Sequence, residues 1–122
     1  MLLRWLSRRV AEDVRGRLGA GRILLIDERA NSFGIESRGA LQIRGNGCLA
    51  LTAGELVFVM WIPRRELRIP RDRITTVERA RSHLGKRIGR DLLRVRFLDD
   101  AGDSDSVAWF VRNLPAWEAA LS

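Results

Sequence analysis

The chain has 122 residues, with 22 basic residues against 15 acidic ones, one His, one Cys and a net charge of +7. This length fits a single domain, and 46% hydrophobic with 30% charged residues is typical of a folded protein rather than a disordered one. No apolar run approaches the roughly 20 residues that span a bilayer. One thiol excludes an internal disulfide, and one thiol with one imidazole excludes a zinc site.

The chain begins with a predicted amphipathic helix, within residues 1–20, followed by a single domain at 21–122. At 3.6 residues per turn, one face of this helix is apolar and the other is basic. The apolar stretch is interrupted by arginines and followed by Glu12 and Asp13, which is unlike a secretory signal. Two interpretations stay open: the helix packs on the domain or on a second copy, or it lies in a membrane interface together with Trp5. The apolar face comprises Leu3, Leu6, Val10 and Val14, with Leu2 beside it, and the basic face Arg4, Arg8 and Arg15.

After residue 21 the pattern changes to short apolar segments bounded by turn residues, which predicts strands. Residues 92–98 alternate clearly between core-facing and exposed side chains. Residues 53–54 predict a tight hairpin, 37–47 a loop or a bulged strand, 82–89 a glycine-marked loop, and 99–105 an acidic hairpin loop. The predicted strands are 23–26 with a continuation to 35, 48–52, 55–62, 66–69, 73–81, 92–98 and 107–111.

The chain ends in a second predicted helix. Asn113 suits the N-cap and Pro115 the first turn. Leu114, Trp117 and Leu121 are spaced to form one buried stripe. A helix of about eight residues is marginal alone, so it must be held by docking, and we expect it to cover the open apolar end of a curled sheet.

The stretch 47–78 carries a strand ending in Leu-Thr before a hairpin, then an ELVF strand, then an IP…I..V segment that opens the next strand. In these features it resembles bacterial PH-like domains, particularly GRAM-type ones, over about residues 23–122. The resemblance implies a mainly β (α+β) fold: a curled antiparallel sheet or open barrel of about seven strands, capped by the C-terminal helix. It implies no particular ligand. The segments 81–86 and 107–109 are also similar to small uncharacterised bacterial proteins, and the Arg-rich composition fits a high-GC bacterium.

The basic excess is concentrated between residues 64 and 96, where guanidinium groups and loop glycines suit phosphate oxygens. The alternative is a solvated face partly paired with neighbouring acids. Phosphoinositide-binding PH domains use a basic first loop, and the corresponding 37–47 offers only Arg38 and Arg44, so that pocket is not carried over. The predicted anion- or partner-binding residues are Arg64, Arg65, Arg68, Arg71, Arg73, Arg81, Lys86, Arg87 and Arg90.

The residues that usually carry catalysis or bind metals are few. His83 has no second His or Cys nearby and is expected in a turn or at the surface, and Cys48 is expected to be a small core residue. The acids at 99–105 lack the spacing of a calcium loop, and the GNG at 45–47 is no phosphate-binding loop. The sequence therefore predicts neither an enzyme nor a metal or cofactor site.

These observations predict a non-catalytic binding or adaptor module that contacts a protein or an anionic membrane surface through a basic face. Two alternatives are self-association through residues 1–16 and weak nonspecific nucleic-acid binding. The nucleic-acid alternative is disfavoured because no Trp, Tyr or Phe lies between Arg64 and Arg96 for bases to stack on. We expect a cytoplasmic protein, with peripheral attachment at the inner face of the membrane as one option.

Overall fold

The computed structural model describes residues 2–122, and the side chains of all of these except 38–42, 86 and 88. In this part of the chain, seven strands form one antiparallel sheet in the order β4-β3-β2-β1-β7-β6-β5. The strands are β1 (Leu25–Ile35), β2 (Gly39–Leu51), β3 (Glu55–Met60), β4 (Glu66–Pro70), β5 (Ile74–His83), β6 (Lys86–Leu98) and β7 (Ser104–Phe110). The helices are α1 (Leu2–Leu18) and α2 (Leu114–Leu121), and the single 3-10 turns are η1 (Ala20–Arg22), η2 (Glu36–Arg38) and η3 (Arg71–Arg73).

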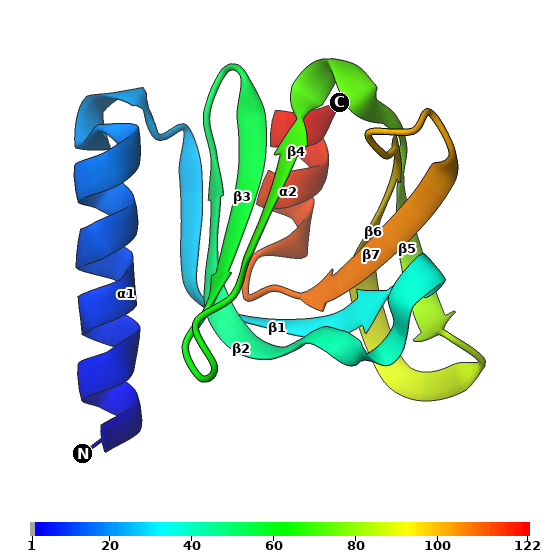
Figure 1. The fold of residues 1–122 in the computed structure, drawn as a ribbon, viewed down its shortest axis with the longest axis horizontal. Helices are drawn as coiled ribbons and strands as arrows, with labels where there is room; N and C mark the ends of the chain where they lie inside the picture. Colours follow the sequence, from blue (N-terminus) through cyan, green and yellow to red (C-terminus); the bar gives the residue numbers. More distant parts are fainter. Residues whose placement is uncertain (1) are drawn as a thin grey trace.

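The sheet curls into a half-barrel, with α1 against its outer surface and α2 inside the curve (Figure 1). This arrangement confirms the predicted fold class: a curled antiparallel sheet with one helix at each end of the chain. No helix in the described part of the chain is long and apolar enough to span a membrane.

The long strand β1 joins the two halves of the half-barrel, because it pairs with β2 along its length and with β7 from Asn31 onwards. Its register against β2 shifts between Asp27 and Ala30 and again between Phe33 and Ile35. Such bulges bend a strand and increase its twist. The two edge strands of the sheet, β4 and β5, are consecutive in the chain and connected through η3.

Two predicted loops have a different structure. The stretch 37–47 consists of the end of η2 and the first part of β2, so the bulged-strand interpretation is the one confirmed. The predicted loop at 82–89 is wrong, because β5 runs to His83, which pairs with Lys86. Leu84 and Gly85 alone make the turn, with φ of 54° and 77°. Positive φ at both central residues gives a turn whose twist matches that of the flanking strands, so the hairpin continues on either side.

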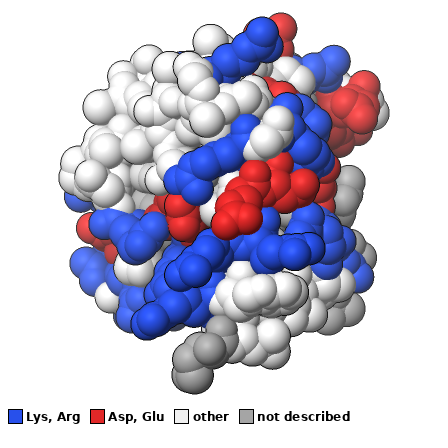
Figure 2. Space-filling model, turned by 90° about the vertical axis from the view of Figure 1, so that its left-hand side faces the viewer, with Lys and Arg blue, Asp and Glu red and all other residues white. Residues whose placement is uncertain are grey.

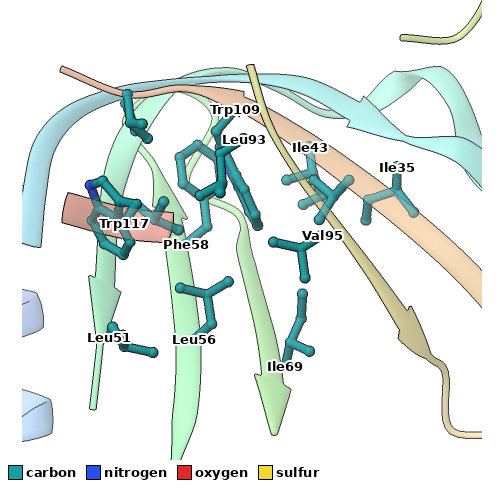
Figure 3. Close-up of a cluster of buried hydrophobic side chains, with 14 of the residues drawn as sticks. Ile35, Ile43, Leu51, Leu56, Phe58, Ile69, Leu93, Val95, Trp109 and Trp117 are labelled. Atoms are coloured by element: carbon teal, nitrogen blue, oxygen red, sulfur yellow. The ribbon is translucent and has the colours of Figure 1, made fainter. Parts of the chain in front are cut away.

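Helix α2 covers the inner surface of the half-barrel, as predicted. Asn113 accepts a hydrogen bond from the Ala116 backbone N–H at its side-chain oxygen and so caps the helix. Trp117 is 1% exposed and lies among core side chains from several strands (Figure 3). The rings of Phe58 on β3 and Trp109 on β7 lie beside it in the same core, with centroids 5.8 Å apart.

Helix α1 packs on the outer surface of β2 and β3, which agrees with the packing interpretation of the sequence. Val10, Ala11 and Val14 are buried there in a second, smaller core. The predicted apolar face is only partly right, because Leu3 is 61% exposed while Ser7 is buried. Cys48 is buried in the same outer core, as expected, and burial raises the pKa of its thiol to about 12, so the thiol stays neutral.

Candidate anion-binding surface

The arginines at the β3–β4 connection are largely engaged in ion pairs. Arg64 donates to Asp13 of α1 at 3.0 Å. Arg68 binds both carboxylate oxygens of Glu55 across the β3–β4 pair, at 2.9 and 2.5 Å. This hydrogen-bonded pair lowers the pKa of Glu55 and raises that of Arg68. Arg65, beside them, is exposed.

The arginines of η3 hold neighbouring backbone in place. Arg71 donates to the Ala120 carbonyl of α2 at 3.1 Å, and Arg73 donates to the Asp99 carbonyl in the β6–β7 turn at 2.7 Å. Both therefore connect η3 to elements distant in sequence. They lie at the end of β4 opposite to Arg64 and Arg65.

The remaining residues of the predicted site surround the β5–β6 hairpin, on the half of the sheet away from α1 (Figure 1). Arg81 donates to the Gly89 carbonyl at 3.1 Å, and the guanidinium carbon of Arg90 lies 4.6 Å from the centre of the Phe110 ring. Arg87 is exposed, whereas the side chain of Lys86, like that of Arg38, lies outside the described ones. The predicted residues are thus divided among three places, and their role in binding stays a prediction.

A different group of arginines converges on α1. Figure 2 looks onto this helix and shows basic side chains gathered in a broad band across the lower part of the face. A groove of about 430 Å³ lies between α1, β1 and the β7–α2 connection. The groove is lined by Arg4, Ser7, Arg8, Glu28, Arg29 and Arg112.

Two acids hold the walls of this groove. Asp27, whose side chain is 4% exposed, accepts hydrogen bonds from the Arg29 backbone N–H at 2.9 Å and from Nε of Arg112 at 3.0 Å. It also accepts from the Arg112 backbone N–H at 2.8 Å. Glu28 binds Arg15 of α1 at 2.6 Å. By contrast, the guanidinium groups of Arg4, Arg8 and Arg29 form no ion pair with a side chain that the structure describes.

A second hollow of about 350 Å³ adjoins the groove, since Arg4 and Arg29 line both. Its other lining residues are Leu3, Asn46 and Trp61. The indole N–H of Trp61 is buried with no hydrogen-bond partner among the described residues. Apolar side chains are exposed around this end of the molecule: Leu2, Leu3 and Trp5 on α1, and Ile62 in the β3–β4 connection.

A larger hollow, of about 660 Å³, lies at the other end of α1, near η1 and the β2–β3 turn. Its titratable side chains are Arg22 and Glu55, and Glu55 already pairs with Arg68. This hollow therefore has volume without an arrangement of chemical groups that points to a ligand. We give more weight to the smaller arginine groove for this reason.

The residues considered as candidates for catalysis or metal binding make hydrogen bonds within the fold. His83 ends β5 directly before the Leu84–Gly85 turn and is buried, so of the two expected positions, turn or surface, the surface one is wrong. Its Nε2 donates to the Gly34 carbonyl at 2.8 Å. Burial lowers the pKa of this imidazole, and the hydrogen bond to Gly34 partly opposes the shift. Asp99 accepts hydrogen bonds from the backbone of its own turn, and Asp105 accepts two from Ser37. Among the described residues, no three His, Cys, Asp or Glu side chains are placed to share a metal ion.

The arginine groove was not predicted from the sequence, although the spacing of two of its arginines could have indicated part of it. Arg4 and Arg8 are one helical turn apart on the predicted basic face of α1. Arg29 and Arg112 are 83 positions apart in sequence, and the pairing of β1 with β7 brings them near each other, where Asp27 binds the backbone of both. No family model, curated protein or solved structure matches this chain.

Proposed function

We propose that this protein is a non-catalytic, PH-like binding module that docks on an anionic membrane surface. The docking surface is the end of the molecule formed by the first turns of α1, the β3–β4 connection and the neighbouring part of β1, here called the basic–apolar end. The observation that carries the proposal is the combination there of exposed apolar side chains with unpaired arginines. The basic–apolar end comprises Leu2, Leu3, Arg4, Trp5, Arg8, Arg9, Arg29 and Ile62.

The apolar side chains of this end are placed to enter the boundary between headgroups and acyl chains. Trp5 is 54% exposed and Ile62 is 63% exposed, although the helix packs well further along. Arg9 lies over the Trp5 ring, 5.2 Å from its centre, so a cation accompanies the aromatic group. Because the rest of α1 is packed on the sheet, only its first turns can enter the interface, and so small an apolar area gives weak, reversible binding.

The arginines supply the second part of the affinity. A basic residue close to an anionic leaflet contributes about 1 kcal/mol, and the contribution falls off within a Debye length. Arg4, Arg8 and Arg29 can contribute in this way because none is neutralised by a described acid. Binding should therefore need anionic lipid and should weaken as salt is added.

The positive charge of this end also favours membrane docking over self-association through α1. Val10 and Val14 are already buried against the sheet, so only the first turns of the helix remain apolar and exposed. Pairing those turns between two copies would bring Arg4, Arg8 and Arg9 of both chains together. Like charges oppose such a contact, whereas an anionic bilayer matches them.

Vesicle co-sedimentation tests the proposal. Vesicles of phosphatidylcholine alone are compared with vesicles that also contain phosphatidylglycerol, at low and high salt. We expect binding to the anionic vesicles only, and a loss of about tenfold or more in the double variant Leu3→Ser, Trp5→Ser. Leu24→Ser is the matched control, because Leu24 is 60% exposed but lies at the opposite end of α1.

Three results would overturn the proposal: equal binding to both vesicles, no binding to either, or equal losses in the test and control variants. Light scattering and a DNA shift titration run alongside examine the alternatives. A dimer abolished by Leu3→Ser, Trp5→Ser in place of vesicle binding would support self-association. A steeply salt-dependent DNA shift in place of vesicle binding would support the nucleic-acid alternative.

A further inference from the structure

We propose that the groove lined by Arg4, Arg8, Arg29 and Arg112 is a binding site for a phosphate monoester. This inference deepens the proposed function, on which it rests only for the source of the phosphate, a lipid headgroup. The groove itself is defined by its geometry and charge. Both can be tested without a membrane.

The walls of the groove come from three elements. Arg4 and Arg8 are four residues apart on α1, which places their Cβ atoms on one side of the helix, about 5–6 Å apart. Arg29 comes from β1, and Arg112 lies in the β7–α2 connection, two residues after the end of β7. The volume of about 430 Å³ admits a phosphate group together with the first atoms of its ester. Four guanidinium groups from three parts of the chain thus border one small volume.

The charges in the groove do not balance. The charge of Asp27 is matched by Arg112 and that of Glu28 by Arg15, each in an ion pair. Arg4, Arg8 and Arg29 then leave three positive charges beside the groove without a described acid. Like charges brought together this way are unfavourable unless an anion joins them. The unmatched charge favours a dianion over a monoanion.

This charge count selects the chemical class of the ligand. A phosphate monoester carries a charge of about −1.5 to −2 near pH 7, because its second pKa is about 6. A phosphate diester has one ionisable proton fewer and remains a monoanion. Guanidinium groups bind phosphate oxygens through two parallel N–H donors, so several of them satisfy a terminal phosphate well.

Asp27 fixes two walls of the groove in advance and is a positioning residue. Its buried carboxylate holds the backbone of both Arg29 and Arg112, and it also binds Nε of the Arg112 side chain. A guanidinium has five donors, so the Nη groups of Arg112 stay available for a phosphate. Because these two walls are already held in place, less conformational entropy is lost when a ligand binds.

The neighbouring hollow suits the rest of a lipid. Arg4 and Arg29 line both hollows, and Leu3 and Trp61 line only the second. A phosphate in the groove would place an attached apolar group over Leu3, beside the basic–apolar end. A soluble phosphate ester has no apolar group to place there. This difference separates a lipid headgroup from a free phosphate ester.

The experiment compares two headgroups in vesicles of equal anionic lipid content, phosphatidic acid as the monoester and phosphatidylglycerol as the diester. Binding of the full chain to phosphatidic acid is expected to be tighter by about tenfold, as one additional charge-assisted hydrogen bond would give. The variant Arg8→Gln, Arg29→Gln should lose this preference and keep weaker binding to both vesicles. The control Arg22→Gln, Arg44→Gln removes the same charge at exposed sites outside the groove and should keep the preference.

A parallel calorimetric titration with glycerol 3-phosphate tests the free ester. Binding as tight as that of phosphatidic acid vesicles, and lost in Arg8→Gln, Arg29→Gln, would assign the site to a free phosphate ester. Equal affinity for the two kinds of vesicle would overturn the groove as a monoester site while leaving membrane docking intact. Binding of glycerol 3-phosphate without vesicle binding would keep the groove and overturn the membrane proposal. Absence of all binding would overturn both.

Discussion

The two helices differ in how the sheet uses them. Helix α2 has eight residues, yet its Trp117 is 1% exposed and belongs to the main core. Helix α1 has 17 residues, but its buried residues are Ser7, Val10, Ala11 and Val14, and its first turn remains exposed. The contribution of a helix to stability thus depends on the surface that receives it more than on its length. The surplus apolar residues of α1 are the ones that we assign to docking.

The largest expected difference between the two helices is the loss of stability when the tryptophan of each is replaced. Trp117→Ala should destabilise the protein by about 3–5 kcal/mol, because it empties a fully buried site. Trp5→Ala, the same change on α1, should cost less than about 0.5 kcal/mol, because Trp5 is 54% exposed. Denaturant unfolding followed by circular dichroism measures both. Similar losses for the two variants would show that the helices do not differ in this way.

Two glycines, one on the sheet and one on α1, allow a second comparison of a crowded position with an open one. A Cβ at Gly47 on β2 would lie 2.5 Å from the Val59 carbonyl oxygen and 2.6 Å from the Phe58 ring. Gly47→Ala must therefore move β3 and should cost about 1–3 kcal/mol. A Cβ at Gly16 on α1 meets nothing within 4 Å, so Gly16→Ala should stabilise the helix by about 0.5–1 kcal/mol. Thermal melts should show shifts of opposite sign, and a neutral Gly47→Ala would contradict the close approach.

The last expected effect concerns pH, on the half of the sheet away from α1. Burial lowers the pKa of His83 below 6.5, against the opposing hydrogen bond to Gly34. Arg94 and Arg96 also lower this pKa, while Glu36 raises it. Between the lowered pKa and 6.5 the unfolded chain binds a proton that the folded chain does not, so stability falls as pH decreases.

Denaturant unfolding between pH 7.5 and 5 measures this loss, which should not exceed about 1.4 kcal/mol per pH unit for one group. In His83→Gln, where an amide N–H replaces the imidazole donor to Gly34, the slope above pH 5 should largely disappear. An equal slope in the variant would show that another group is responsible. An unchanged stability of the wild-type chain over this range would contradict the shift itself.

Much of the fold follows from local pattern. The alternation at 92–98 predicts that Leu93, Val95 and Phe97 face the core, and all three are buried there. Asn113 caps α2 as its type and position predict. These features depend on residues a few positions apart, so a sequence window contains them. The basic residues of the predicted site were also chosen from one stretch of sequence, but the fold places them in three separate parts of the surface.

The sequence alone determined the two helices and most of the strands, because their apolar patterns repeat with the period of the local backbone. Only the tertiary structure decided how α1 is turned on the sheet, so that Ser7 is buried and Leu3 exposed, and that His83 lies inside. It also brought Arg29 and Arg112 together through Asp27. These outcomes depend on the bend of β1 and on β1–β7 pairing across most of the chain, and no local pattern encodes such long-range contacts.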